Sequence, residues 1–393
     1  MQTETPPKRG ERLLTILLMG LIAVSGGFGA FMLAHNTSPP QSPLGGINVH
    51  LHVTVRNQTG ALIPQDTRNV NGDLVLNNFN YFLGGLFDPS GASITGSGQV
   101  LDSSNGGGYA GNDVWTYSDY VDTSDGCTTS AICGGFVGIG TSTTAPARTN
   151  YGLGSQYGSF VSAASSTCST GTTDTIDFSG TVPITSTATI TEAAGGSENQ
   201  QNAQGPIVYF HDTFTGISVA SGDSVDASYS VSLGTAGFNV NLCNILAGFF
   251  TPVTSATAVS VSLKDTAGTA VTWYMWQPAN SNGCFLSTSA TACSAPTSPA
   301  SFIAIGTGTT TYTPTTYALG TQVASTTMGT ISYVSGTTST IYYLGTFTTA
   351  SGDSITEGAI GLTLSSNNYL FFGSTFTAQS AGNPFGISAE ISD

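Results

Sequence analysis

A gapless internal repeat is the feature that most constrains the fold of this 393-residue chain. The stretch FVGIGTSTTAPARTNYGLGSQ from Phe136 aligns without a gap with FIAIGTGTTTYTPTTYALGTQ from Phe302, and about half of the positions are identical. Shorter matches flank both stretches in the same order: YFLGGLFDP from Tyr81 with NILAGFFTP from Asn244, Asp125-Gly126-Cys127 with Asn282-Gly283-Cys284, Ile190-Thr191-Glu192 with Ile355-Thr356-Glu357, and Phe210-xx-Thr213-Phe214-Thr215 with Phe372-xx-Thr375-Phe376-Thr377. This order predicts two tandem copies of one domain, residues 47–235 and 236–393.

Strict alternation of apolar and polar residues predicts that these copies are built from strands. It is clearest in 47–56, and it returns near the end of each copy, in 225–233 and 385–391. Charged residues make only 7% of the chain, whereas β-branched, aromatic and turn-forming residues are abundant. We therefore expect an all-β fold of two antiparallel β-sandwich or jelly-roll-like domains, each with its own core. Short helices are expected only near 81–87 and 242–250.

The N-terminal region predicts export. Residues 1–12 carry Lys8, Arg9 and Arg12, and residues 13–34 form an uncharged apolar run long enough to span a bilayer. The basic flank predicts a cytoplasmic N-terminus and an extracytoplasmic remainder, joined to the membrane by the Pro/Ser/Gly linker 35–46. The expected location is a cell membrane crossed once, or a secreted or virion surface if the segment is removed.

Three interpretations of residues 13–34 remain open. The run fits a retained transmembrane anchor, and the small residues 23–25 fit the cleavage site of a signal peptide. Lys8-Arg9-Gly10 also resembles the processing site of type IV pilin-like precursors, a resemblance that implies a filament core. Glu11 and Arg12 depart from the apolar start of that family.

A second resemblance covers most of both copies. A GxGTTAP-like stretch is followed by a Tyr-x-Leu-Gly element, by Ile-Thr-Glu, by an aromatic Thr-Phe-Thr strand and by a final alternating strand. This order resembles structural β-domains of tailed-phage and archaeal-virus virion proteins and of surface appendages. The resemblance implies a packing or adhesive role and assigns no catalytic residue.

The six cysteines predict disulfides in an oxidising compartment. Their positions relative to the repeat predict one local pair in each copy and leave a third pair by default: Cys127–Cys133, Cys284–Cys293 and Cys168–Cys243. Asn36 and Asn57 begin Asn-x-Ser/Thr sequons on the expected outer side and are candidate glycosylation sites.

One segment resembles a catalytic motif. Residues 352–358, GDSITEG, are similar to the nucleophile block of GDSL/SGNH hydrolases, which would make Ser354 the nucleophile. That family needs a histidine downstream, but no histidine follows His211 in this chain. Because a serine needs a neighbouring base to act as a nucleophile, we predict that the chain is not an enzyme.

Other candidate binding residues each have a simpler structural interpretation. His50 and His52 share one face of a strand, Asp113, Asp119, Asp122 and Asp125 lie in a glycine-rich stretch, and Trp115, Trp273 and Trp276 could contact sugars. We expect a solvated strand face, no metal site and core packing of the tryptophans. No cofactor is predicted. With 22 acidic against 7 basic residues the chain is not expected to bind nucleic acid.

Taken together, the sequence predicts a non-catalytic extracytoplasmic structural or adhesive protein. It would be tethered to a membrane through residues 13–34, be a filament subunit, or be associated with a virion. Its partners would be copies of itself or a surface glycan or protein. The alternative function is a secreted carbohydrate-binding protein or hydrolase.

Overall fold

The computed structural model describes residues 47–71, 74–87, 134–164, 166–171, 173–198, 206–234, 237–251, 258–275, 285–291, 294, 299–328, 330–334, 340–347, 353–380 and 385–392. The chain divides into residues 1–42 and a compact unit, residues 43–393, and everything below concerns the compact unit. The predicted membrane segment, 13–34, lies outside the described residues. Among those residues, no helix has the length and apolar character needed to cross a bilayer.

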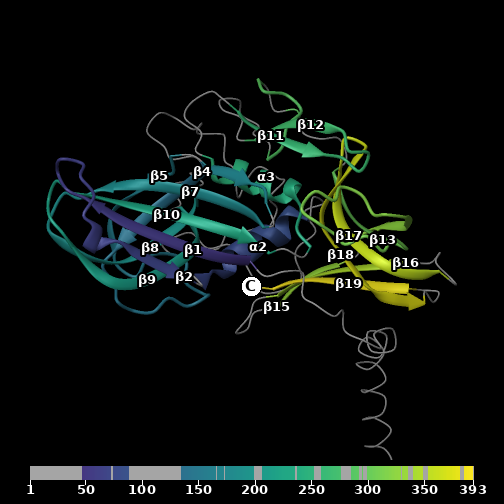
Figure 1. Ribbon diagram of the computed structural model, residues 1–393, viewed down its shortest axis with the longest axis horizontal. Helices are drawn as coiled ribbons and strands as arrows, with labels where there is room; N and C mark the ends of the chain where they lie inside the picture. Colours follow the sequence, from purple (N-terminus) through teal and green to yellow (C-terminus); the bar gives the residue numbers. More distant parts are fainter. Residues whose placement is uncertain are drawn as a thin grey trace, which may run out of the picture. The chain divides into compact units, whose positions relative to one another are not determined.

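Copy 1 is a sandwich of two five-stranded antiparallel sheets, drawn in purple to teal in Figure 1. The first sheet has the order β2-β1-β10-β7-β6, with strands β1 (Ile47–Arg56), β2 (Arg68–Asn71), β6 (Ser166–Ser169), β7 (Asp174–Pro183) and β10 (Ser224–Leu233). The second sheet has the order β3-β9-β8-β4-β5, with strands β3 (Leu74–Val75), β4 (Gly134–Gly140), β5 (Gln156–Ser162), β8 (Ala188–Glu198) and β9 (Ile207–Val219). A short 3-10 helix, η1 (Pro64–Asp66), connects β1 to β2.

The alternation seen in the sequence sets the faces of the first sheet. β1 buries every second residue from Ile47 to Val55, and β10 buries every second residue from Val225 to Leu233. The two strands pair along their whole length, from Ile47 opposite Leu233 to Arg56 opposite Ser224. Because side chains alternate between faces, this register places both apolar rows on the core side.

Copy 2 repeats this arrangement with fewer strands. One sheet has the order β14-β13-β17-β18, with β13 (Ala300–Gly306), β14 (Gln322–Thr327), β17 (Ser354–Leu364) and β18 (Asn367–Ser380). The other has the order β15-β16-β19, with β15 (Thr330–Val334), β16 (Thr340–Phe347) and β19 (Phe385–Ser392). Strands β11 (Val259–Lys264) and β12 (Ala270–Met275) form a separate hairpin. The predicted all-β, sandwich-like fold is thus confirmed.

The two short segments expected to be helical correspond to α2 (Asn77–Leu86), which ends one residue before the end of the expected 81–87, and α3 (Val240–Phe250), which includes 242–250. The first residues of each helix donate hydrogen bonds to a strand of the same copy, and the bonds in the two copies match. Backbone N–H groups donate to strand carbonyls, and asparagine side chains donate to the same strands: Leu76 to Tyr209 (2.8 Å), Asn239 to Phe371 (3.1 Å), Asn78 to Val208 (3.0 Å) and Asn241 to Leu370 (3.0 Å). The repeat found in the sequence therefore corresponds to repeated contacts.

Each helix ends in the core of the other copy. Phe87, the residue after α2, packs against three aromatic rings of copy 2, whereas Phe250, the last residue of α3, packs against three of copy 1. The first set is Tyr343 (5.6 Å between ring centroids), Phe371 (5.6 Å) and Phe372 (5.0 Å), and the second is Phe178 (4.7 Å), Tyr209 (6.0 Å) and Phe210 (6.0 Å). We refer to this arrangement as the phenylalanine exchange.

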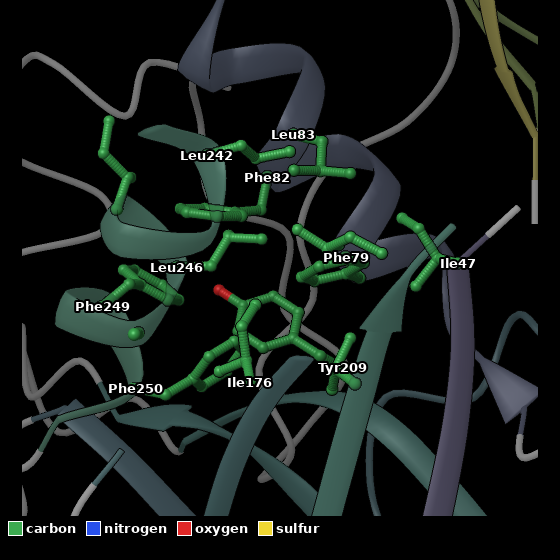
Figure 2. Packing of buried hydrophobic residues seen from close by; sticks show 14 of the residues in the cluster. Ile47, Phe79, Phe82, Leu83, Ile176, Tyr209, Leu242, Leu246, Phe249 and Phe250 are labelled. Atoms are coloured by element: carbon green, nitrogen blue, oxygen red, sulfur yellow. The ribbon is translucent and has the colours of Figure 1, made fainter. Parts of the chain in front are cut away.

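The exchange joins the two copies through one continuous core. Phe82 of α2 stacks on Phe249 of α3 at 4.1 Å, and Figure 2 shows the apolar side chains of both helices meeting above the strands of copy 1. One cluster of buried side chains contains residues of both copies, from Ile47 to Phe372. The main core is therefore shared between the copies, and each copy keeps only a smaller buried cluster of its own. The alternation did not predict the shared core, because helix packing across the copies is not encoded in local alternation.

Candidate functional site

One glutamate in each copy is buried beneath a threonine-rich loop. Glu192 lies on β8 and is 0% exposed, and Glu357 lies on β17 and is 3% exposed. The loops are residues 141–155, between β4 and β5, and residues 307–321, between β13 and β14. We call them the pinned loops.

In copy 1 the carboxylate of Glu192 accepts three backbone hydrogen bonds from its loop. The N–H groups of Ser142 and Ser155 donate to Oε1 at 3.0 and 2.8 Å, and that of Gly154 donates to Oε2 at 2.9 Å. The neighbouring Thr191 hydroxyl donates to the Ser142 carbonyl at 2.7 Å. The carboxylate thus gives partners to backbone donors that lie outside the sheet ladders.

Copy 2 reproduces this network atom for atom. The N–H groups of Gly308 and Thr321 donate to Oε1 of Glu357 at 2.9 Å each, and that of Gly320 donates to Oε2 at 3.0 Å. The Thr356 hydroxyl donates to the Gly308 carbonyl at 2.7 Å. Hydrogen bonds to an ionised acceptor are stronger than neutral ones, so each glutamate holds both ends of its loop.

A glycine before each loop makes room for the carboxylate. A Cβ atom on Gly140 would collide with Oε1 of Glu192 and with the carbonyl of Ser155. A Cβ atom on Gly306 would collide in the same way with Oε1 of Glu357 and with the carbonyl of Thr321. The repeated Ile-Gly-Thr and Ile-Thr-Glu segments are therefore parts of one structural element.

Copy 1 adds a histidine to this network. His211 Nε2 lies 2.9 Å from Oε2 of Glu192, and both side chains are buried. Burial raises the pKa of the Glu192 carboxyl, but the bonds from His211 and from Gly154, Ser155 and Ser142 together bring that pKa below its ordinary value. At the position that matches His211, copy 2 has Gly373, where a Cβ atom would collide with the ring of Tyr312.

Glu192 and Ser354 have different surroundings in the fold. The oxygens of Glu192 already accept four hydrogen bonds and have no exposed surface. Ser354 is exposed at the start of β17, opposite Ser380, whereas His211 bonds to Glu192 inside copy 1. Thr356 and Glu357, within the GDSITEG segment, belong to the pinned-loop network.

The outer surface of both pinned loops presents hydroxyl groups. Thr143 and Thr144 are exposed in copy 1, and Thr309, Thr310 and Thr311 are exposed in copy 2. Beside the first loop lies a hollow of about 430 Å³ lined by Arg68, Asn69, Val70, Thr143, Thr213, Phe214 and Thr215. The Arg68 guanidinium donates to the carbonyls of Thr215 (3.0 Å) and Gly216 (3.2 Å) and so fixes one wall of the hollow.

Among the predicted disulfides, Cys168–Cys243 is present and links β6 of copy 1 to α3 of copy 2. Cys127, Cys133, Cys284 and Cys293 lie outside the described residues, so their pairing stays a prediction. Asn36, the four aspartates at 113–125, Trp115 and Trp276 also lie outside them. Trp273 is buried and its Nε1 donates to the Tyr369 hydroxyl at 3.3 Å, as core packing requires.

The remaining predicted residues lie on β1 and in the turn after it. His50 and His52 are half-buried, and Nδ1 of His52 lies 2.6 Å from Oδ1 of Asn69. In the part of the chain that is described, no cluster of three His, Cys, Asp or Glu side chains is placed to hold a metal ion. Oδ1 of Asn57 accepts from the N–H (3.0 Å) and hydroxyl (2.7 Å) of Thr59 and from the N–H of Ala61 (3.0 Å). These three bonds leave out Nδ2, the atom that carries an N-linked glycan.

The sequence showed the Ile-Thr-Glu repeat but not that its glutamate holds a loop in place. Glutamate is rare in this chain, and its recurrence at matching positions in both copies, after the same threonine, was the available signal. His211 carried no such signal because the second copy lacks it.

The fold and the site together define a duplicated β-sandwich protein with a carboxylate-pinned loop in each copy. Comparisons with protein-family profiles, with curated proteins and with solved structures found no match.

Proposed function

We propose that this chain is a non-catalytic structural or adhesive protein that acts outside a membrane or on a particle surface through contacts of its β-domains. The observation that supports this most is the pinned loop, present in both copies with the same donors and the same buried carboxylate. A loop that is already held in one shape loses little conformational entropy when it binds another surface. This preorganisation favours binding.

The link between the copies supports the same function. The phenylalanine exchange and the Cys168–Cys243 disulfide join copy 1 to copy 2, as suits a subunit that must keep its shape under load. Disulfides persist in oxidising compartments, in agreement with the export signal predicted from residues 1–34.

The surface chemistry indicates how such contacts would form. Charged residues make 7% of the chain, and the exposed parts of the pinned loops carry hydroxyl groups. Hydroxyls bind through hydrogen bonds, which ions screen far less than they screen pairs of exposed charges. We therefore expect binding or self-assembly that changes little between low and high salt.

The proposal is tested on the full chain purified from its native membrane or particle. Electron microscopy and sedimentation should show ordered assemblies or binding to the native surface. Replacement of Thr309, Thr310 and Thr311 by alanine should reduce the assembly or the surface binding, whichever is observed, without lowering the melting temperature. Thr187→Ala, an exposed threonine in the turn between β7 and β8, serves as the matched control.

Two results would contradict the structural function. One is dispersed protein that hydrolyses esters or glycosides and loses that activity on Glu192→Gln or Ser354→Ala. The other concerns location: protease added outside intact cells should remove the region beyond residue 46, and full protection of that region would exclude a surface role.

The hollow beside the first pinned loop favours a second candidate, carbohydrate binding. Its lining combines hydroxyls and an amide with the half-buried ring of Phe214, the mixture that sugar sites use. Glycan-array binding that is lost on Phe214→Ala but kept in the triple threonine variant would favour this function. Equal loss in both variants, or no glycan binding at all, would leave the structural function in place.

A further inference from the structure

The two copies differ at one edge of the sandwich. In copy 1, β10 lies between β1 and β7, so both of its edges are paired. In copy 2, the matching strand β19 pairs with β16 on one side, from Phe385 opposite Phe347 to Ser392 opposite Thr340. No strand within the described residues pairs with the other edge of β19.

In the sequence, copy 2 has no counterpart of the segment that forms β1 and β2 in copy 1. In copy 1 the segment Ile47–Asn71 supplies β1 and β2 before β3 begins. In copy 2 only residues 234–237 separate Leu233, the end of β10, from Phe238. Phe238 is the counterpart of Val75, because it bridges Phe372 as Val75 pairs with Phe210. The duplicated unit therefore lacks its first hairpin.

We infer that the free edge of β19 is an interaction surface for the β19 strand of a second copy of this chain. An unpaired edge presents a row of backbone donors and acceptors, and proteins usually protect such edges with proline or with charged side chains, lysine above all. The sequence of β19, FGISAEIS, contains no proline or lysine, and its one charged residue is Glu390, near the end of the strand. The linker 35–46, which precedes β1, is a poor alternative occupant because Pro39, Pro40 and Pro43 lack the N–H groups that a ladder needs.

A second β19 fits this edge without any other rearrangement. Two antiparallel copies of one strand are related by a two-fold axis perpendicular to the sheet, so one self-complementary contact completes both molecules. The result is a continuous sheet with the order β15-β16-β19-β19-β16-β15. The inference rests on the sheet order alone and does not depend on the proposed function.

Hydrogen–deuterium exchange of the full chain at several concentrations tests the inference. Pairing with a second copy is a mass-action equilibrium, so diluting the protein about a hundredfold through the dissociation constant should speed exchange of the outward amides of β19 roughly tenfold. β10 is the internal control: β1 covers its edge within the same molecule, so its protection should not depend on concentration. Protection of β19 that is independent of concentration would assign the edge to the same chain, and fast exchange at every concentration would show an open edge. Either result overturns the inference.

A cysteine scan over residues 386–390 identifies the partner strand. In an antiparallel two-fold pair one residue lies opposite itself, with Cβ atoms about 5 Å apart. Oxidative cross-linking into covalent dimers should therefore peak at one position and fall on either side. Ser228→Cys, in the middle of β10, is the matched control and should give no dimer. A flat profile, or equal cross-linking at Ser228→Cys, would exclude β19 pairing even if the chain oligomerises through another surface.

Discussion

Copy 1 and copy 2 share a sandwich plan, but within the described residues only copy 1 has a strand on both sides of its last strand. Both use the same carboxylate network and the same helix start, but copy 1 adds β1, β2 and His211. The shared parts are those that shape the pinned loop and dock the helix. The additions close a sheet edge and extend the network. The duplication therefore preserved the loop and its support, whereas the edge of copy 2 was left for another strand.

Separating the copies is the most severe test of this comparison. Residues 236–393 expressed alone should fail to give a cooperative thermal unfolding transition by circular dichroism, because α3 loses the core that covers Phe249 and Phe250. Co-expression with residues 1–235 should restore the transition. A cooperative transition in the isolated half would show that the continuous core is not required.

Truncating the phenylalanine exchange should weaken both copies by similar amounts. Phe87→Ala and Phe250→Ala each remove a fully buried ring and should lower the free energy of unfolding by about 3–5 kcal/mol in denaturant titrations. The exposed Tyr151→Ala is the control and should change it little. Strongly unequal losses would mean that one copy does not depend on the exchange.

Removing the disulfide between copies should have a somewhat smaller effect. Replacing Cys168 and Cys243 together by alanine opens a link across 75 residues and should cost about 2–4 kcal/mol of unfolding free energy. The phenylalanine exchange stays intact in this variant, so the protein should still unfold in one transition. Two separate transitions would show that the disulfide, and not the core, couples the copies.

Substituting the buried glutamate of each copy compares the two pinned-loop networks directly. Glu192→Gln and Glu357→Gln should each cost about 1–3 kcal/mol at neutral pH, and the loss should be larger for Glu192 because His211 also loses its ionised partner. The pKa of Glu192 is lowered in the folded protein, so its contribution is present above the unfolded value of about 4.3 and is lost as pH falls through the folded pKa. Melting curves of wild type and Glu192→Gln should converge in acid. Parallel curves down to acid pH would contradict the role of the charge.

The smallest expected effect is a gain in stability, on replacing Asp174. Asp174 is buried at the start of β7, and burial raises the pKa of its carboxyl above the ordinary value. Ionisation then opposes folding, so stability falls as pH rises from the unfolded pKa, about 3.9, through the folded one. Asp174→Asn should raise the melting temperature at neutral pH and have no effect well below pH 3.9. A loss at neutral pH would show that the charge has a favourable partner.

Local patterns in the sequence predicted what local physics determines. The period of two in 47–56 and 225–233 predicted β1 and β10 with their buried faces, and the apolar clusters near Phe82 and Leu246 predicted the helices. The Cys168–Cys243 pair followed from the duplication by default. The phenylalanine exchange could not be predicted, because a buried phenylalanine looks the same in sequence whichever core it enters. The same limit hid Glu192 and Glu357, whose partners are backbone groups of a distant loop.

The phenylalanine exchange also constrains the order in which the chain can mature. A ribosome releases copy 1 first, but its core needs Phe249 and Phe250 from a helix made later. Strand β1 must likewise wait for β10, since Ile47 pairs with Leu233. Contacts between residues so far apart in sequence form slowly and leave apolar surface uncovered in the meantime. The nascent first half therefore exposes apolar surface until α3 has emerged, so a stall in translation before Val240 should favour aggregation more than one after Phe250.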